Sequence, residues 1–220
     1  MDKCKFLTAT ALVAALSIPT ITHGALVGRL AVTEGGTDYQ AYYDTEADLT
    51  WLADANAAGT TMNWANANAW SAGLNIAGVT GWRLADTQQP DSTCSSQTST
   101  ASFGYFCENS EMGNLFHNVL GGSPESSITT SHNSNYDLFE NILPLNYWSN
   151  SSYQYDDNFA FLFVFGGGVQ HYDDKSHNWN AWAVHTGDVA TLSAVPIPAA
   201  VWLLCSGLIG LAGFARRKKI

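Results

Sequence analysis

Four aspartates near a predicted hairpin are the first residues whose type and spacing could do chemistry. Asp156 and Asp157 precede the segment 159–172, and Asp173 and Asp174 follow it. If this segment folds back at its glycine turn, the four carboxylates meet at the open end of the hairpin. Carboxylates so close together repel one another unless a cation lies between them, and oxygen ligands suit calcium. The alternatives are therefore a calcium site and a solvated acidic rim that aids solubility.

Aromatic side chains set among polar residues form a second candidate site. Tyr153, Tyr155, Tyr172 and Trp179 lie among Asp, Asn, Ser and His residues, where a ring is expected at the surface. Planar rings beside amides and carboxylates can stack on sugar rings and hydrogen-bond their hydroxyls. The same four residues could also do no more than pack a loop, and the sequence leaves both alternatives open.

Sequence motifs for catalysis are absent. The chain contains no Gly-x-Ser-x-Gly elbow, no His-Glu-x-x-His pair, no P-loop and no dinucleotide fingerprint. None of its central histidines stands at metal-ligand spacing from another. A catalytic triad is recognised by its geometry, which a sequence does not show. We therefore expect a protein that is not an enzyme, with no catalytic residue and no cofactor beyond the weak calcium candidates.

Two of the four cysteines fall in the central part of the chain. Cys94 and Cys107 stand thirteen positions apart, whereas Cys4 and Cys205 belong to the two ends. No second pair of Cys or His is near enough to complete a zinc site. In an exported chain such a pair is expected to form a disulfide, which would pin the polar stretch 95–102.

The N-terminal end is typical of a targeting segment. Lys3 and Lys5 precede an uncharged apolar stretch that is too short to span a bilayer comfortably, and Gly24 and Ala25 follow as small residues. This pattern is typical of a signal peptide that passes through the Sec translocon and is removed by signal peptidase. We therefore expect residues 1–25 to be a signal peptide.

The C-terminal end carries a second apolar block. Residues 198–215 contain no charge, and as a helix they would span about 27 Å, close to the hydrocarbon thickness of a bilayer. Four basic residues follow at once, so the positive-inside rule places this end in the cytoplasm and the upstream chain outside. The pattern predicts a transmembrane helix that anchors the protein in the inner membrane.

The order of elements at this end resembles a known sorting signal. Its members are a Val-Pro-x-Pro-Ala motif, an apolar helix and a basic tail, here marked by Val195, Pro196, Pro198, Ala199, Arg216 and Arg217. This order resembles the VPxPA variant of the PEP-CTERM class. The resemblance implies that residues 194–220 are processed by an exosortase, a membrane peptidase of Gram-negative bacteria that make exopolysaccharide. A permanent anchor without processing is the alternative.

Charge is distributed unevenly along the chain. The whole sequence has a formal net charge of −10, but six of its nine basic residues lie in the two ends. The middle keeps Arg29, Arg83 and Lys175 against eighteen acids, which gives it a net charge of −15. A domain with so few cations is not expected to bind nucleic acid, because phosphate contacts need clustered Lys and Arg.

Local patterns predict an α+β fold between the two ends. Asn63 can cap a helix that runs to Leu74, and Ser110 can cap a second helix that ends before Gly121. Strands are predicted at 41–44, 48–52, 78–84 after a turn, 147–149, 159–165, 169–172 and 181–184. We interpret the later strands as one antiparallel sheet with a glycine turn. The expected fold is an irregular compact domain with an antiparallel sheet and two main helices.

An ordered set of short segments resembles a known family. The segments are Asp44-Thr45, Leu49-Thr50-Trp51, 63–67, Gly81-Trp82-Arg83-Leu84, Tyr147-Trp148-Ser149 and 181–184. Their order resembles the Lcl C-terminal domain family, a domain of unknown function common in bacterial surface proteins. It also resembles, more distantly, C-type-lectin-like and formylglycine-generating-enzyme architectures. Ala85 stands in place of a proline, and His185 stands where related chains often have Arg, which weakens any expectation of an anion-binding arginine.

Together these patterns predict a domain at 26–193 in an exported protein of a Gram-negative bacterium. We expect an exosortase to sort it to the cell surface or an extracellular matrix, where it binds or organises material such as exopolysaccharide or other glycans. The first alternative is a secreted enzyme on the formylglycine-generating scaffold. Enzymes of that kind depend on cysteine or copper chemistry, whereas the two cysteines of this domain are expected to form a structural disulfide. The second is a purely structural matrix subunit.

Overall fold

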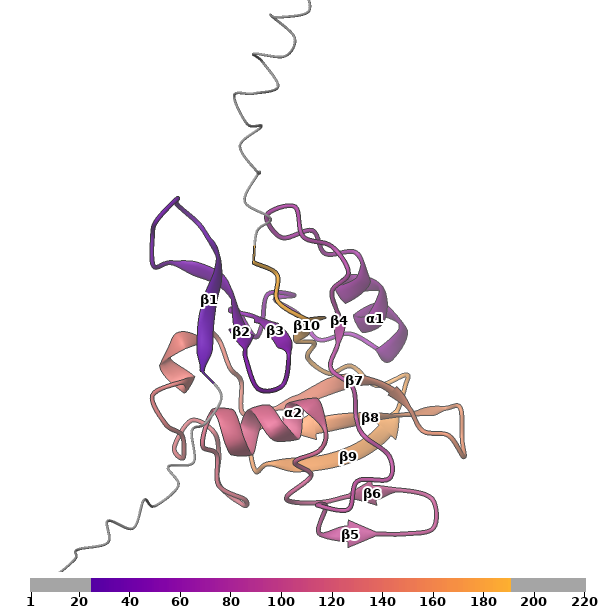
Figure 1. Cartoon of the computed structure of the whole chain (residues 1–220). Coiled ribbons are helices and arrows are strands. Elements are labelled where there is room, and N and C mark those ends of the chain that lie inside the picture. The colour runs from indigo at the N-terminus through magenta and orange to yellow at the C-terminus, as the bar shows by residue number, and fades with distance from the viewer. Residues whose placement is uncertain (1–24, 191–220) are drawn as a thin grey trace, which may run out of the picture.

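The computed structural model describes residues 25–190, and the ends drawn in grey in Figure 1 lie outside that range. The sorting segment 194–220, its transmembrane helix and residues 1–24 of the signal peptide are therefore outside the described residues. None of the helices between residues 25 and 190 has the length and apolar character needed to cross a bilayer. The two targeting segments remain predictions from the sequence.

The larger of the two main sheets has five antiparallel strands. In spatial order they are β1 (Leu26–Ala31), β2 (Tyr39–Asp44), β3 (Leu49–Leu52), β10 (Ala183–Thr186) and β4 (Arg83–Leu84). The strands predicted at 41–44 and 48–52 are confirmed as β2 and β3, which pair as a hairpin, whereas β1 was not predicted. The last described strand, β10, lies between β3 and β4, as Figure 1 shows.

That position of β10 corrects the sequence interpretation. The segment 181–184 was expected to join the later strands, but β10 pairs with β3 and β4 instead. The indole of Trp182 reaches the carbonyl oxygen of Leu52 at 2.8 Å, and its ring meets the Trp51 ring edge-on at 5.4 Å. These buried aromatic contacts hold the end of the chain in the first sheet.

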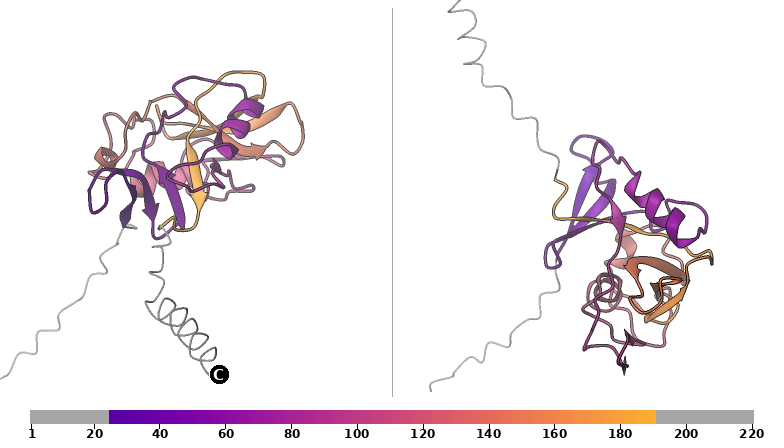
Figure 2. Two further views of the ribbon diagram at one scale, coloured as in Figure 1. Left: turned by 90° about the horizontal axis from the view of Figure 1, so that it is seen from above. Right: turned by 90° about the vertical axis from the view of Figure 1, so that its right-hand side faces the viewer.

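The second main sheet has three antiparallel strands, β7 (Asn146–Ser152), β8 (Phe159–Val164) and β9 (Val169–Asp174). The central strand β8 reads Phe-Ala-Phe-Leu-Phe-Val and is buried on both faces, which explains its unbroken apolar run. The predicted glycine turn joins β8 to β9, and Gly168 there has a positive φ of 69°. Figure 2 shows this sheet packed across the first.

Two helices flank the sheets, as expected. Helix α1 (Trp64–Ala72) begins at Asn63, whose side chain accepts a hydrogen bond from the Asn66 amide, so the predicted cap is confirmed. Helix α2 (Glu111–Asn114) continues into a π-helical turn, Leu115–Val119. The remaining elements are a 3₁₀ turn, Tyr136–Leu138, and a small hairpin of β5 (Ser96–Gln97) and β6 (Ser102–Phe103).

Ser110 precedes the second helix as predicted, but its side chain does not cap that helix. Ser110 makes no side-chain hydrogen bond to the helix it precedes. Its hydroxyl accepts a hydrogen bond from the Gln88 amide at 3.0 Å and donates to Asp91 at 3.3 Å. The residue therefore ties α2 to the segment before the disulfide-bonded loop.

The two faces of the three-stranded sheet are covered by different helices. Paired residues share a face and successive residues alternate, so Phe163 and Leu162 point in opposite directions. Phe163 packs against Phe116 after α2, with ring centroids 5.5 Å apart. Leu162 belongs to a separate buried cluster with Trp148 and Ala67 of α1. We call these the α2 face and the α1 face.

A candidate ligand-binding groove

The four predicted calcium ligands lie near the open end of the β8–β9 hairpin, but hydrogen bonds occupy the carboxylate oxygens of Asp156, Asp173 and Asp174. One oxygen of Asp173 accepts from the indole of Trp179 at 2.9 Å and from the ring of His177 at 3.0 Å. Its other oxygen accepts from the Asp174 amide. Partial burial opposes ionisation of Asp173, yet these hydrogen bonds outweigh it and lower the pKa of the carboxyl.

Lys175 bonds to oxygens near the same end of the hairpin, but to none of the four carboxylates. The ammonium group of Lys175 donates to the carbonyl oxygen of Asp157 at 2.8 Å and to the Ser152 hydroxyl at 2.6 Å. Asp174 and Asp156 accept from backbone amides in their own turns. Among the described residues these aspartates form no converging group of three ligands. The four carboxylates therefore lie near one end of the hairpin without forming a common set of metal ligands.

The one converging group of potential metal ligands in residues 25–190 is Asp91 with Cys94 and Cys107. The two sulfurs are joined in a disulfide, which confirms the predicted pairing. Asp91 is fully buried and accepts from the Thr93 amide and from the amide side chain of Asn109. The group therefore has a structural role, because the disulfide and the hydrogen bonds of Asp91 hold the loop 94–107 against the domain.

Three of the four predicted aromatic residues do meet. The rings of Tyr153 and Tyr172 stack with centroids 4.8 Å apart and planes 4° from parallel. Tyr155 packs against Tyr153 at 5.8 Å and is 57% exposed. Tyr172 pairs directly with Phe161, which is two residues from Phe163 in β8 and therefore shares its face. The rings thus lie on the α2 face. We call Tyr153, Tyr155 and Tyr172 the tyrosine cluster.

The fourth predicted residue, Trp179, lies elsewhere. Its indole bonds to Asp173, which follows Tyr172 in β9 and so points to the opposite face of the sheet. Trp179 packs against the cluster of Leu162 and Trp148 on the α1 face. A single aromatic surface made by all four residues is therefore ruled out. The sequence interpretation failed here because a shift of one residue along a strand reverses the face.

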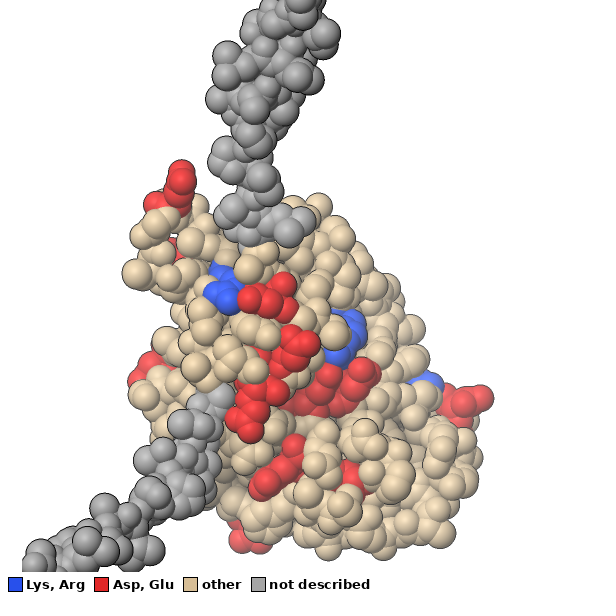
Figure 3. All heavy atoms as spheres, in the orientation of Figure 1, with Lys and Arg blue, Asp and Glu red and all other residues tan. Residues whose placement is uncertain are grey.

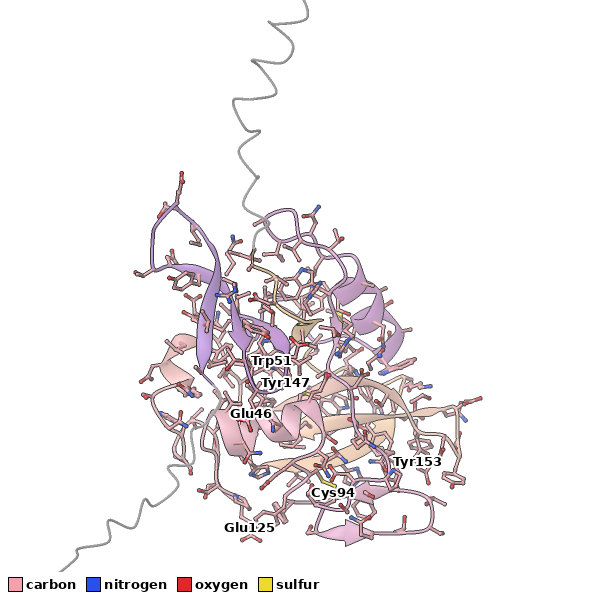
Figure 4. All side chains as sticks on the ribbon, viewed as in Figure 1. Glu46, Trp51, Cys94, Glu125, Tyr147 and Tyr153 are labelled. Atoms are coloured by element: carbon pink, nitrogen blue, oxygen red, sulfur yellow. A yellow bond between two sulfur atoms is a disulfide. The ribbon has the colours of Figure 1, made fainter. Side chains whose placement is uncertain are left out.

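A surface groove begins beside the tyrosine cluster. It consists of two adjoining hollows with volumes of about 330 and 170 Å³. Both are lined by Gln89, Thr100 and Gln154, so they form one continuous depression. Tyr153 lines the larger hollow and Tyr155 the smaller. Figure 4 shows Tyr153 at the end of the molecule that also carries Cys94.

Three chain segments form the walls, and hydrogen bonds fix each of them. The Gln89 side chain bonds to both the amide and the carbonyl of Ser102, at 2.8 and 2.9 Å, which locks the first wall to the β5–β6 hairpin. The amide of Thr87 donates to the Ser151 hydroxyl at 2.8 Å, which locks it to the end of β7. The disulfide closes the loop that carries the hairpin. The groove is therefore preformed.

Other groups in the groove are left open to solvent. The amide side chain of Gln154 is exposed, and no hydrogen bond joins it to another of the described residues. The Tyr153 hydroxyl likewise has no such partner, although its ring is held by the stack with Tyr172. A ligand can therefore replace the water that solvates these groups without breaking any hydrogen bond within the protein.

Charge is nearly absent from the groove lining. Asp86 is its one charged residue, and this carboxylate contacts Arg83 at 3.3 Å and the amide of Asn150 at 2.9 Å. Arg83 in turn bonds both oxygens of Glu111 at 2.7 Å. Partial burial works against the charge of Arg83, but its carboxylate partners raise the pKa of the guanidinium. In Figure 3 the surface over β5 and β6 is mostly uncharged, whereas acids form a band above it.

Two histidines interact with their surroundings in opposite ways. His177 is exposed, and its hydrogen bond to Asp173 raises the pKa of the ring. His117 packs between Phe116 and Phe106 after α2, where burial lowers the pKa of its ring. Within residues 25–190 no hydroxyl group is bonded to the His177–Asp173 pair, so the structure shows an orienting carboxylate without a nucleophile.

Sequence reasoning missed most of the groove. Its polar lining comes from Gln88, Gln89, Thr100 and Gln154, which belong to segments far apart in the chain. The available signal was the pair of cysteines, which predicts that the polar stretch between them is held in place. Nothing local indicates that this stretch lies beside the end of β7.

Fold and groove together define a class of protein, an α+β domain of two antiparallel sheets with a disulfide-bonded loop beside a preformed polar groove. The family model for the Lcl C-terminal domain matches residues 40–185. The chain therefore belongs to the Lcl C-terminal domain family. No curated protein and no solved structure matches it. The likeness to lectin-like and formylglycine-generating architectures thus remains a prediction.

Proposed function

We propose that this protein is a non-catalytic, exported surface or matrix protein whose central domain binds glycans in the groove. The observation that carries the proposal is the lining itself, in which amide and hydroxyl side chains lie beside two tyrosine rings in a preformed depression. Sugars offer hydroxyl groups around their edges and C–H groups on their faces. Amides match the first as donors and acceptors, and aromatic rings match the second.

The placement of the groove fits display away from a membrane. The described chain ends beyond β10 at the top of Figure 1, whereas β5 and β6 lie toward the bottom. The segment 98–101, which joins these two strands, lines the smaller hollow of the groove. If the predicted helix at 198–215 holds the protein in the inner membrane, the groove lies on the side of the domain far from the residue at which the described chain ends. In this proposal the Sec translocon and signal peptidase deliver the protein, and an exosortase then sorts it through residues 194–220 to the cell surface or the exopolysaccharide matrix.

A glycan array with the full-length protein in mild detergent tests the binding proposal. We expect binding by the wild type and loss of most of it in Tyr155→Ala, because this ring is exposed and lines the smaller hollow. Asn178→Ala is the matched control, since Asn178 is exposed and follows shortly after β9, outside the groove lining. Absence of binding to any glycan would leave a purely structural matrix role.

The sorting proposal has a separate test. Mass spectrometry of the mature exported protein should find a C-terminus upstream of Arg216. Recovery of Ile220 in the exported protein would show that the tail is a permanent anchor.

A further inference from the structure

No Lys or Arg side chain lines either hollow of the groove. Arg83 is held by Glu111 at 2.7 Å and by Asp86 at 3.3 Å. Lys175 donates to the main-chain carbonyl oxygen of Asp157 and to the hydroxyl of Ser152, a residue of the lining, and its ammonium lies over the Trp64 ring at 4.2 Å. Arg29, the remaining cation of residues 25–190, forms its ion pair with Asp188. Every basic side chain of the described domain thus has a partner.

An anionic sugar would therefore be unfavourable in the groove. A carboxylate or sulfate entering it loses water and gains only amide and hydroxyl contacts, so its desolvation is not repaid by an opposite charge. The domain also carries eighteen acids against three basic residues, which repels polyanions at a distance. An uncharged sugar incurs neither cost.

The shape of the groove adds a constraint on length. The two hollows share Gln89, Thr100 and Gln154, and each has its own tyrosine, Tyr153 in the larger and Tyr155 in the smaller. A single sugar unit can fill the smaller hollow of about 170 Å³ but leaves most of the larger one, about 330 Å³, empty. A chain of two or more sugar units can occupy both hollows, because Gln154 lies between them and can bond to either unit.

Building on the proposed glycan-binding function, we infer that the ligand is an uncharged oligosaccharide segment of at least two sugar units, and that uronic-acid and sulfated glycans are excluded. The Gln154 amide is the central polar contact, and Tyr153 and Tyr155 are the two stacking platforms.

The test uses neutral, uronic-acid and sulfated oligosaccharides of one to six units, immobilised on one array and probed with the full-length protein. We expect neutral members to bind about tenfold more strongly than charged members of equal length. Binding should rise from one to two or three units and then level off. Raising NaCl from about 20 to about 300 mM should change neutral binding less than about twofold, since screening acts on charged pairs.

A gain-of-function variant supports the same test. Gln154→Lys places a cation between the hollows and should raise binding of uronic-acid oligosaccharides about fivefold or more. Asn178→Lys adds the same charge outside the groove and should not. Charged members that bind the wild type as well as neutral ones, with loss in Tyr155→Ala, would overturn the inferred ligand class but leave glycan binding intact. Binding to no member of any set would overturn the proposed function itself.

Discussion

The disulfide between Cys94 and Cys107 supports the loop that forms one wall of the groove, and its removal should affect both stability and binding. The two residues are 13 positions apart. A closed loop of this length restricts the unfolded chain by about 3 kcal/mol in the chain-entropy model. For a domain of this size each kcal/mol corresponds to about 2–4 °C in Tm, so the double variant Cys94→Ala/Cys107→Ala should melt about 6–12 °C lower.

The assay is thermal unfolding followed by near-UV circular dichroism, with and without reductant. Reductant present through the transition should lower the wild-type Tm toward that of the double variant and leave the variant unchanged. Glycan binding should weaken as well, because Thr100 and the rest of the β5–β6 hairpin lose their tether. A fall in Tm below about 2 °C would refute the reasoning, since it would mean that other contacts already restrict this loop.

Three further predictions concern single side chains. Asn63→Ala should cost about 1 kcal/mol in urea unfolding through loss of the cap of α1, and Asn63→Asp should not. Arg83→Met should cost about 1.5–3 kcal/mol, because it leaves Glu111 half-buried without its guanidinium partner; a smaller loss would show that water replaces it. Burial lowers the pKa of His117, so its contribution is present above its unfolded pKa of about 6.5 and is lost as the pH falls through the folded value. The Tm of His117→Gln should therefore fall less than that of the wild type between pH 7 and pH 5, and equal slopes would contradict this.

Local signals in the sequence predicted the elements that depend on neighbours in the chain. The cap at Asn63, the glycine turn after β8 and the apolar run of β8 each involve residues a few positions apart. The disulfide was predictable as well, because only two cysteines remain once the ends are set aside. These features need no knowledge of the tertiary fold.

Features that depend on distant segments were not predictable. Ser110 has the residue type and position of a helix cap, but Gln88 and Asp91 take its hydroxyl. Trp179 has the same polar surroundings as the tyrosines, but it lies on the other face of the sheet. The groove is the extreme case, because three separate segments form its walls.

The position of β10 has a consequence for how the protein reaches its folded state. This strand fills the gap between β3 and β4, and its neighbour Trp182 is bonded to a residue 130 positions earlier. A chain that emerges from its N-terminus, whether from a ribosome or a translocation pore, cannot complete the larger sheet until residue 186 has appeared. Such long-range pairing also makes folding slow. The larger sheet is therefore completed only when almost the whole described domain has emerged.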